Sequence, residues 1–146
     1  MPTIASFKRA ILQFFRPVSR PVFKCRDRLG VIYLTPLRVG FSHLKEHKFR
    51  HNFLDTLDPF CSCRSGDVEN TIHFLLHCPS YTDARLVLFN DLNDLPVSVF
   101  PYASSILCKI LLYGISQLSD AVNHDIISSV IRYIIASRRF DESLFN

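Results

Sequence analysis

The segment "CSCRSGDVENTIHFLLHC", residues 61–78, constrains the fold more than any other part of the chain. Its eighteen positions hold three of the five cysteines and two of the six histidines. Thiolates and imidazoles in two close pairs, one at each end of a loop, are typical donors of structural zinc sites, which bind the ion through four tetrahedral ligands. The spacing therefore predicts one structural zinc ion in a Cys-Cys-His-Cys knuckle of Cys61, Cys63, His73 and Cys78.

Two other interpretations of this segment stay open. His77 is a fifth possible ligand because on an α-helix it would share a face with His73, although the adjacent His77 and Cys78 would rarely bind one ion together. Alternatively, "IHFLLHC" is an ordinary buried helix whose histidine and cysteine pack in the core, and the one-residue gap between Cys61 and Cys63 is tighter than usual. A site with four protein ligands is closed to water, so the segment argues against a zinc hydrolase.

Length and composition indicate one domain, or one small domain with an appendage, since the chain has 146 residues and 48% hydrophobic residues. No run of about 18 apolar residues is present, so no membrane partner is expected. The odd number of cysteines and the lack of a secretory signal disfavour a disulfide framework. We therefore expect a nuclear or cytoplasmic protein that is not secreted, although the acid-free first 26 residues also overlap in composition with mitochondrial transit peptides.

Charge is distributed unevenly along the chain. Residues 1–58 carry eleven Lys or Arg and four Asp or Glu, whereas residues 59–146 carry six and nine. A basic segment of this kind is typical of nucleic-acid-binding regions, but it is equally compatible with a solvated basic face that has no partner.

Apolar residues at helical spacing predict a mainly α fold, a small helical domain with the zinc-knuckle loop between a basic N-terminal helical arm and a C-terminal helical bundle. Residues 1–33 are predicted to form the arm and a linker, residues 34–92 the basic helix and zinc-knuckle region, and residues 93–146 the C-terminal helical segment.

Several individual helices follow from the same pattern. A helix over 37–57, weakened at Gly40, would place His43, His47 and His51 on one face. The run "VIYL" is either a strand or the approach to this helix. Pro79 would end the helix "TIHFLLH", and Ser80 would cap the next one. The remaining predicted helices are a short basic one within "SFKRAILQFFRP", one over 81–92, one over 102–113 and one over 117–139.

Two stretches resemble a known family. The runs "LTPLRVGFSHLKEHKFRHNFLDTLDPFCSC" and "ENTIHFLLHCPSYTDARLVLFNDL" are similar to the C-terminal zinc-knuckle region of non-LTR (LINE or jockey-type) retrotransposon endonuclease–reverse transcriptase polyproteins. The similarity covers most of the chain and is strongest from Leu34 to Leu92. One departure is Pro36, where the family pattern has a basic residue, and it is expected to delay the helix start to Leu37.

The resemblance implies a region that follows the polymerase and helps to position RNA or target DNA in reverse transcription. It places zinc on the same four residues, and it makes the parent polymerase domain a possible partner. The chain has no "YADD"-like aspartate pair, no apurinic-type endonuclease and no RNase H carboxylate set, and phosphoryl transfer needs metal-held carboxylates. We therefore expect no enzymatic activity from this chain.

The leading functional hypothesis is a nucleic-acid-binding module. Phosphates would be contacted with little sequence preference, and exposed rings such as Phe60 or Phe74 would stack on unpaired bases, although core packing is the better interpretation for Phe74. The alternatives are a structural or protein-interaction helical module and a retroelement relic without a selected role. The predicted phosphate-contacting residues are Arg38, Lys45, Lys48 and Arg50.

Overall fold

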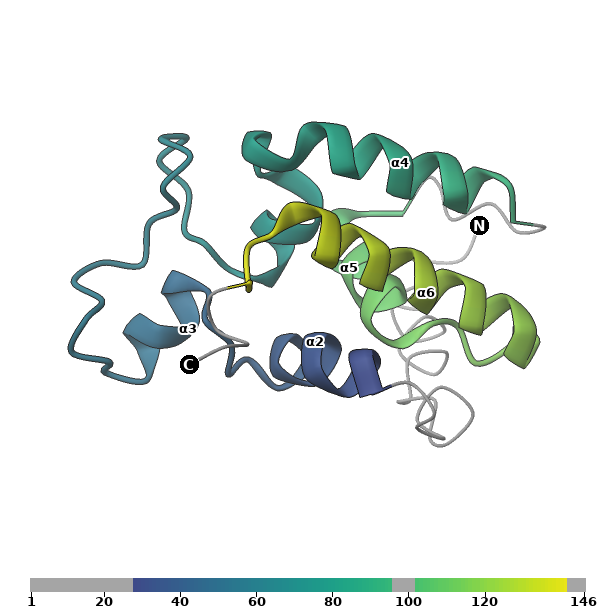
Figure 1. The fold of residues 1–146 in the computed structure, drawn as a ribbon, viewed down its shortest axis with the longest axis horizontal. Helices are drawn as coiled ribbons and strands as arrows, with labels where there is room; N and C mark the ends of the chain where they lie inside the picture. The colour runs from purple at the N-terminus through teal and green to yellow at the C-terminus, as the bar shows by residue number, and fades with distance from the viewer. Residues whose placement is uncertain (1–27, 96–101, 142–146) are drawn as a thin grey trace, which may run out of the picture.

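Helices form most of the fold, which the computed structural model describes over residues 28–95 and 102–141 (Figure 1). The mainly α prediction is confirmed, and the described residues contain one isolated β-bridge, between Phe60 and Val68, and no named strand. The short basic helix expected near the N-terminus lies outside the described residues. The elements are α2 (Arg28–Val39), α3 (Lys45–Arg50), the π-helix η1 (His73–His77), the 3-10 helix η2 (Pro79–Tyr81), α4 (Thr82–Asn93), α5 (Ser104–Tyr113) and α6 (Asp120–Ser137).

Helix α6 is the centre of the helical core. It packs against α4 on one side and against α2 and α5 on the other, while α3 and the loop that follows it lie at one end of the molecule (Figure 1). The apolar faces that the sequence pattern predicts meet here, and burial of this apolar surface is the main force that stabilises the bundle. At most 1% of the side chain is exposed at Leu34, Phe74, Leu88, Leu111 and Val130. None of the described helices is long and apolar enough to cross a membrane.

The turn between α5 and α6 is built around Gly114 and Asn123. The buried Asn123 side chain accepts a hydrogen bond from the Ile115 N–H and donates one to the Ile115 carbonyl, both at 2.8 Å. Gly114 has φ +74°, and a Cβ there would lie 2.5 Å from Asn123 Oδ1. Glycine is thus required by both the backbone angle and the close approach. Ser119 then caps α6 by accepting from the Val122 N–H.

The single helix predicted over 37–57 is wrong. Helix α2 spans Arg28–Val39 and includes "VIYL" and Pro36. Gly40 follows it with φ +72°, and the Phe41 N–H donates to the Pro36 carbonyl at 3.0 Å, which is a Schellman stop. Pro36 therefore does not delay the helix start to Leu37.

The other local predictions near this break also change. Helix α3 is only Lys45–Arg50, so the three histidines share no helical face: His47 is buried, and His43 and His51 are exposed. Ser80 lies inside η2, and its side chain does not cap α4.

Candidate metal centre

A short hairpin presents the first two cysteines. The Phe60–Val68 bridge is flanked by two hydrogen bonds, from the Cys61 N–H to the Asp67 carbonyl at 2.9 Å and from the Glu69 N–H to the Pro59 carbonyl at 2.8 Å. Left-handed residues at Arg64, with φ +64°, and Gly66, with φ +85°, reverse the chain between them. Cys61 and Cys63 thus lie on the first arm and the turn of a closed loop.

The π-helix η1 presents the other two ligands. In a π-helix the N–H of residue i+5 bonds the carbonyl of residue i, and the Cys78 N–H donates to the His73 carbonyl at 2.7 Å. This register brings His73 and Cys78 to the same side, and both are buried. His77, which an α-helix would place beneath His73, is exposed and lies outside the cluster. The π-register therefore selects Cys78 over His77.

The four donor atoms are close enough to bind one metal ion. The three Sγ atoms and the imidazole nitrogen all lie within 4.8 Å of one another, with Cys61 Sγ 3.8 Å from Cys78 Sγ and Cys63 Sγ 3.4 Å from His73 Nε2. Bond lengths of about 2.3 Å to sulfur and about 2.0–2.1 Å to nitrogen place two sulfurs of a tetrahedral zinc site about 3.8 Å apart, and a sulfur and a nitrogen about 3.5 Å apart. The donor set thus fits a tetrahedral ion, and all three cysteines are free thiols.

The neighbours of these donors orient them and set their protonation. His73 directs Nδ1 toward Asp67 Oδ2 at 3.8 Å, so Nε2 faces Cys63. Hydrogen bonding from Ser65 is the main cause that lowers the pKa of Cys63 to about 6. Burial raises the pKa of Cys61 to about 12, so a metal ion must displace the Cys61 proton at neutral pH.

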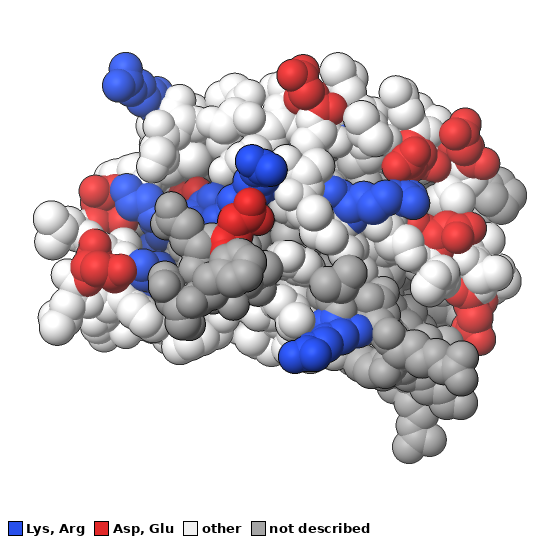
Figure 2. All heavy atoms as spheres, viewed as in Figure 1, with Lys and Arg blue, Asp and Glu red and all other residues white. Residues whose placement is uncertain are grey.

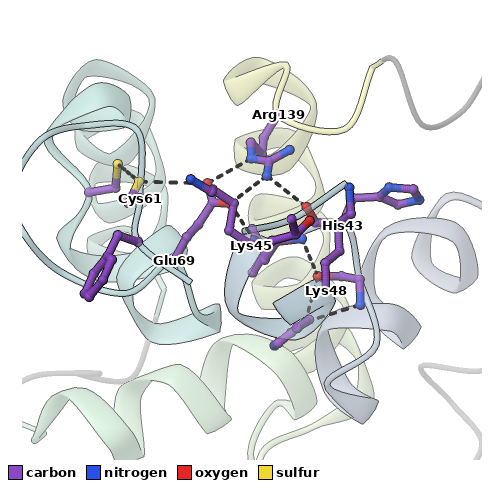
Figure 3. A network of polar contacts seen from close by, with 12 residues as sticks. His43, Lys45, Lys48, Cys61, Glu69 and Arg139 are labelled. Atoms are coloured by element: carbon purple, nitrogen blue, oxygen red, sulfur yellow. Dashed lines mark hydrogen bonds and ion pairs between the residues drawn. The ribbon is translucent and has the colours of Figure 1, made fainter. Parts of the chain in front are cut away.

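Glu69 connects the hairpin to the rest of the molecule (Figure 3). Its carboxylate is buried and receives two hydrogen bonds from Arg139, at 2.6 and 2.9 Å, and one from the Lys45 N–H at 2.8 Å. Burial acts to raise the pKa of Glu69, but Arg139 and Lys45 hold it below its usual value. The same carboxylate lies 3.8 Å from Cys61 Sγ.

Sequence reasoning missed Glu69 and Arg139, because no local pattern marks them. Their partners are brought together only by the fold, across a separation of 70 residues.

Arg38, a predicted phosphate contact, lies in an interhelical contact. Its Nε donates to the Leu112 carbonyl at 2.6 Å, and its guanidinium lies 5.2 Å from the centre of the Tyr113 ring. Burial lowers the pKa of Arg38 to about 10. Arg38 therefore joins α2 to α5.

The other three predicted cations share α3. Lys45 pairs with Asp58 at 3.1 Å, and Lys48 pairs with Asp55 at 2.6 Å. Arg50 donates to the Gly40 carbonyl at 2.9 Å, and 53% of its side chain is exposed. Arg50 also lies 3.8 Å from a carboxylate oxygen of Glu46, so the structure groups these cations next to the hairpin and matches all three with acids.

The two predicted stacking rings differ. Phe74 is buried against the rings of Tyr81, Tyr133 and Phe140, so the core-packing interpretation is confirmed. Phe60, at the hairpin, is 51% exposed.

No family model, curated protein or solved structure matches the chain.

Proposed function

We propose that the chain is a zinc-binding module that holds nucleic acid and catalyses no reaction. The observation that carries the proposal is the convergence of Cys61, Cys63, His73 and Cys78 within 4.8 Å. A tetrahedral set of three thiolates and one imidazole is typical of structural zinc sites. The ion would hold the hairpin against η1 and thereby stabilise the fold.

The same donor set supports a structural role for the metal. With four protein ligands the ion has no open position at which to bind and activate water. The proposal thus gives zinc the task of shaping a binding surface.

The surface next to the hairpin supports nucleic acid as the ligand. An open groove lies between α3 and the hairpin, lined by Phe49 and Arg50 from α3 and by Pro59 and Val68 from the hairpin. Phe49 is exposed, as is Phe60 nearby in the sequence. Exposed rings beside a guanidinium suit a strand whose unpaired bases stack while its phosphates contact cations.

The charge distribution points to the same end of the molecule. Figure 2 shows acidic side chains gathered where α4 ends and α6 begins, opposite the end that carries α3 and the hairpin. Phosphates would be repelled there. At the α3 end, acids and bases alternate, so binding would need Lys45 and Lys48 to exchange Asp58 and Asp55 for phosphate. The resemblance to non-LTR retrotransposon proteins also supports RNA or DNA as the partner.

A salt titration tests the proposal. The zinc-loaded chain is titrated with fluorescent single-stranded RNA and DNA while anisotropy is followed. We expect binding that weakens steadily with salt, and weaker binding for Arg50→Gln than for Arg132→Gln, a matched exposed arginine on α6. The absence of binding at low salt with the metal loaded would overturn the nucleic-acid role.

A second candidate function is protein interaction, and one observation favours it. Leu86 and Val87 on α4 and Ile135 on α6 are exposed by 58%, 59% and 41%. Exposed apolar side chains on packed helices are typical of a docking surface. Sizing chromatography distinguishes protein interaction from nucleic-acid binding. A protein-docking surface predicts that the isolated chain self-associates. Leu86→Ser should remove this self-association, and Arg50→Gln should leave it unchanged.

A further inference from the structure

Two consecutive residues after α6 contact the two halves of the metal centre. Arg138 ends α6 in the left-handed conformation, with φ +57°. Arg139 then forms the double hydrogen bond with Glu69 of the hairpin, and the Phe140 ring packs on Phe74 of η1 with ring centres 5.4 Å apart. The hairpin carries Cys61 and Cys63, and Phe74 is adjacent to His73. The residues that follow α6 thus contact both segments that carry the candidate ligands.

From this juxtaposition we infer that Arg139 is a positioning residue for the metal centre, acting through Glu69, and that metal binding is coupled to the docking of Arg139 and Phe140. The inference rests on the zinc site proposed above and is independent of what the module binds.

Arg139 helps to fix the position of Glu69 and, through it, of the hairpin that carries Cys61 and Cys63. Glu69 binds two separate parts of the chain: its N–H donates to the Pro59 carbonyl, and at the start of α3 its carbonyl accepts from the Glu46 N–H at 3.1 Å and its carboxylate from the Lys45 N–H. Arg139 adds a third part, and it also donates to the His43 carbonyl at 2.9 Å. Partners that orient ligands in this way change metal affinity although they do not touch the ion.

Arg139 also offsets the negative charge of Glu69 beside Cys61. The Glu69 carboxylate lies 3.8 Å from Cys61 Sγ, which must become a thiolate to bind a metal. Two anions at this distance repel each other, and the Arg139 guanidinium offsets the carboxylate (Figure 3). Removal of Arg139 alone would leave Glu69 as an uncompensated negative charge beside the ligand. Removal of both charges would therefore harm metal binding less than removal of Arg139 alone.

A Co²⁺ titration tests the inference, because tetrahedral thiolate-bound Co²⁺ has a visible absorption spectrum that reports ligand geometry. We expect Arg139→Gln to weaken Co²⁺ binding by about 10- to 100-fold and to alter the spectrum. Arg139→Lys, which keeps the charge but not the two-pronged geometry, should recover part of the affinity, and Glu69→Gln/Arg139→Gln should bind better than Arg139→Gln. Arg138→Gln is the matched control, since Arg138 is 84% exposed, and it should behave as the wild type.

A second measurement uses the unaltered chain and does not depend on whether a variant folds. Amide hydrogen exchange is compared with and without zinc, and the metal should slow exchange both at Lys45 and Glu46 and at Arg139 and Phe140. Protection confined to 61–78, or wild-type affinity and spectrum in Arg139→Gln, would overturn the inference. If the unaltered chain gives no Co²⁺ spectrum at all, the zinc site itself is refuted.

Discussion

The Cys78 N–H donates to the carbonyl of His73, five residues earlier, at 2.7 Å. This π-type bond decides which side chains join the Cys61 and Cys63 cluster, because it replaces the α-helical bond that His77 would otherwise make to the same carbonyl. The ligand set is therefore a consequence of helix register as well as of residue type.

Metal content is expected to follow this register. Purified protein should hold one zinc per chain by elemental analysis, and Cys61→Ser, Cys78→Ser and His73→Ala should each lose it. His77→Ala should keep it, because His77 is exposed and lies outside the donor cluster. Loss of zinc in His77→Ala together with retention in His73→Ala would show that His77, and not His73, is the imidazole ligand.

Stability should depend on pH through His47. Burial is the main cause that lowers the pKa of this histidine below 6.5, and Nδ1 accepts a hydrogen bond from the Ser42 N–H at 3.2 Å, which needs the neutral ring. The unfolded chain then binds more protons than the folded chain below pH 6.5. The stability that the neutral His47 ring contributes is fully present above pH 6.5, and it is lost as the pH falls toward the lower pKa of His47 in the folded chain.

Urea unfolding of zinc-loaded protein at several pH values measures this dependence. The zinc ligands also titrate in acid, so the informative quantity is the difference between wild type and His47→Gln, with His43→Gln as an exposed control. The difference in the free energy of unfolding between wild type and His47→Gln should become smaller below pH 6.5. A gap that stays constant from pH 8 to pH 5 would contradict the assignment.

Gly114→Ala should destabilise the protein more than Gly66→Ala does. Both glycines have positive φ, which costs an alanine about 1–2 kcal/mol. A Cβ at Gly66 meets nothing within 4 Å, whereas at Gly114 it would approach Asn123 Oδ1 to 2.5 Å and disturb the α5–α6 turn. We expect an additional loss of about 1–3 kcal/mol in the free energy of unfolding. Equal losses in the two variants, measured by urea unfolding, would show that the contact with Asn123 relaxes without cost.

Arg85→Leu should destabilise the core and weaken the metal site together. The buried Arg85 donates to the Leu75 carbonyl at 3.0 Å and to the Phe74 carbonyl at 3.3 Å, both in η1. A leucine removes the Arg85 donor from the Leu75 carbonyl and one of two side-chain donors from the Phe74 carbonyl, which keeps the Tyr133 hydroxyl, at a cost of about 1–3 kcal/mol. The midpoint temperature of thermal unfolding and the Co²⁺ affinity should both fall, whereas Arg132→Gln, at an exposed site, should change neither. Unchanged Co²⁺ affinity in a folded Arg85→Leu protein would show that the Arg85 contacts with η1 do not affect metal binding.

Two features of the protein follow from the sequence alone. The 3.6-residue period of apolar side chains determines that the chain is mainly helical, and the Cys and His spacing limits a possible metal site to Cys61, Cys63, His73, His77 and Cys78. Both are local properties, since each depends on residues within about one helix or one loop of each other.

Other features were decided only by the tertiary structure. Gly40 ends α2 instead of merely weakening a long helix, because it adopts φ +72° and its carbonyl accepts a hydrogen bond from Arg50 on α3 at 2.9 Å. Arg38, basic and thus expected at the surface, is partly buried because the Leu112 carbonyl and the Tyr113 ring accept it there. The pairing of Glu69 with Arg139 needs two residues 70 positions apart to meet. Long-range packing sets these partners, and no local pattern encodes them.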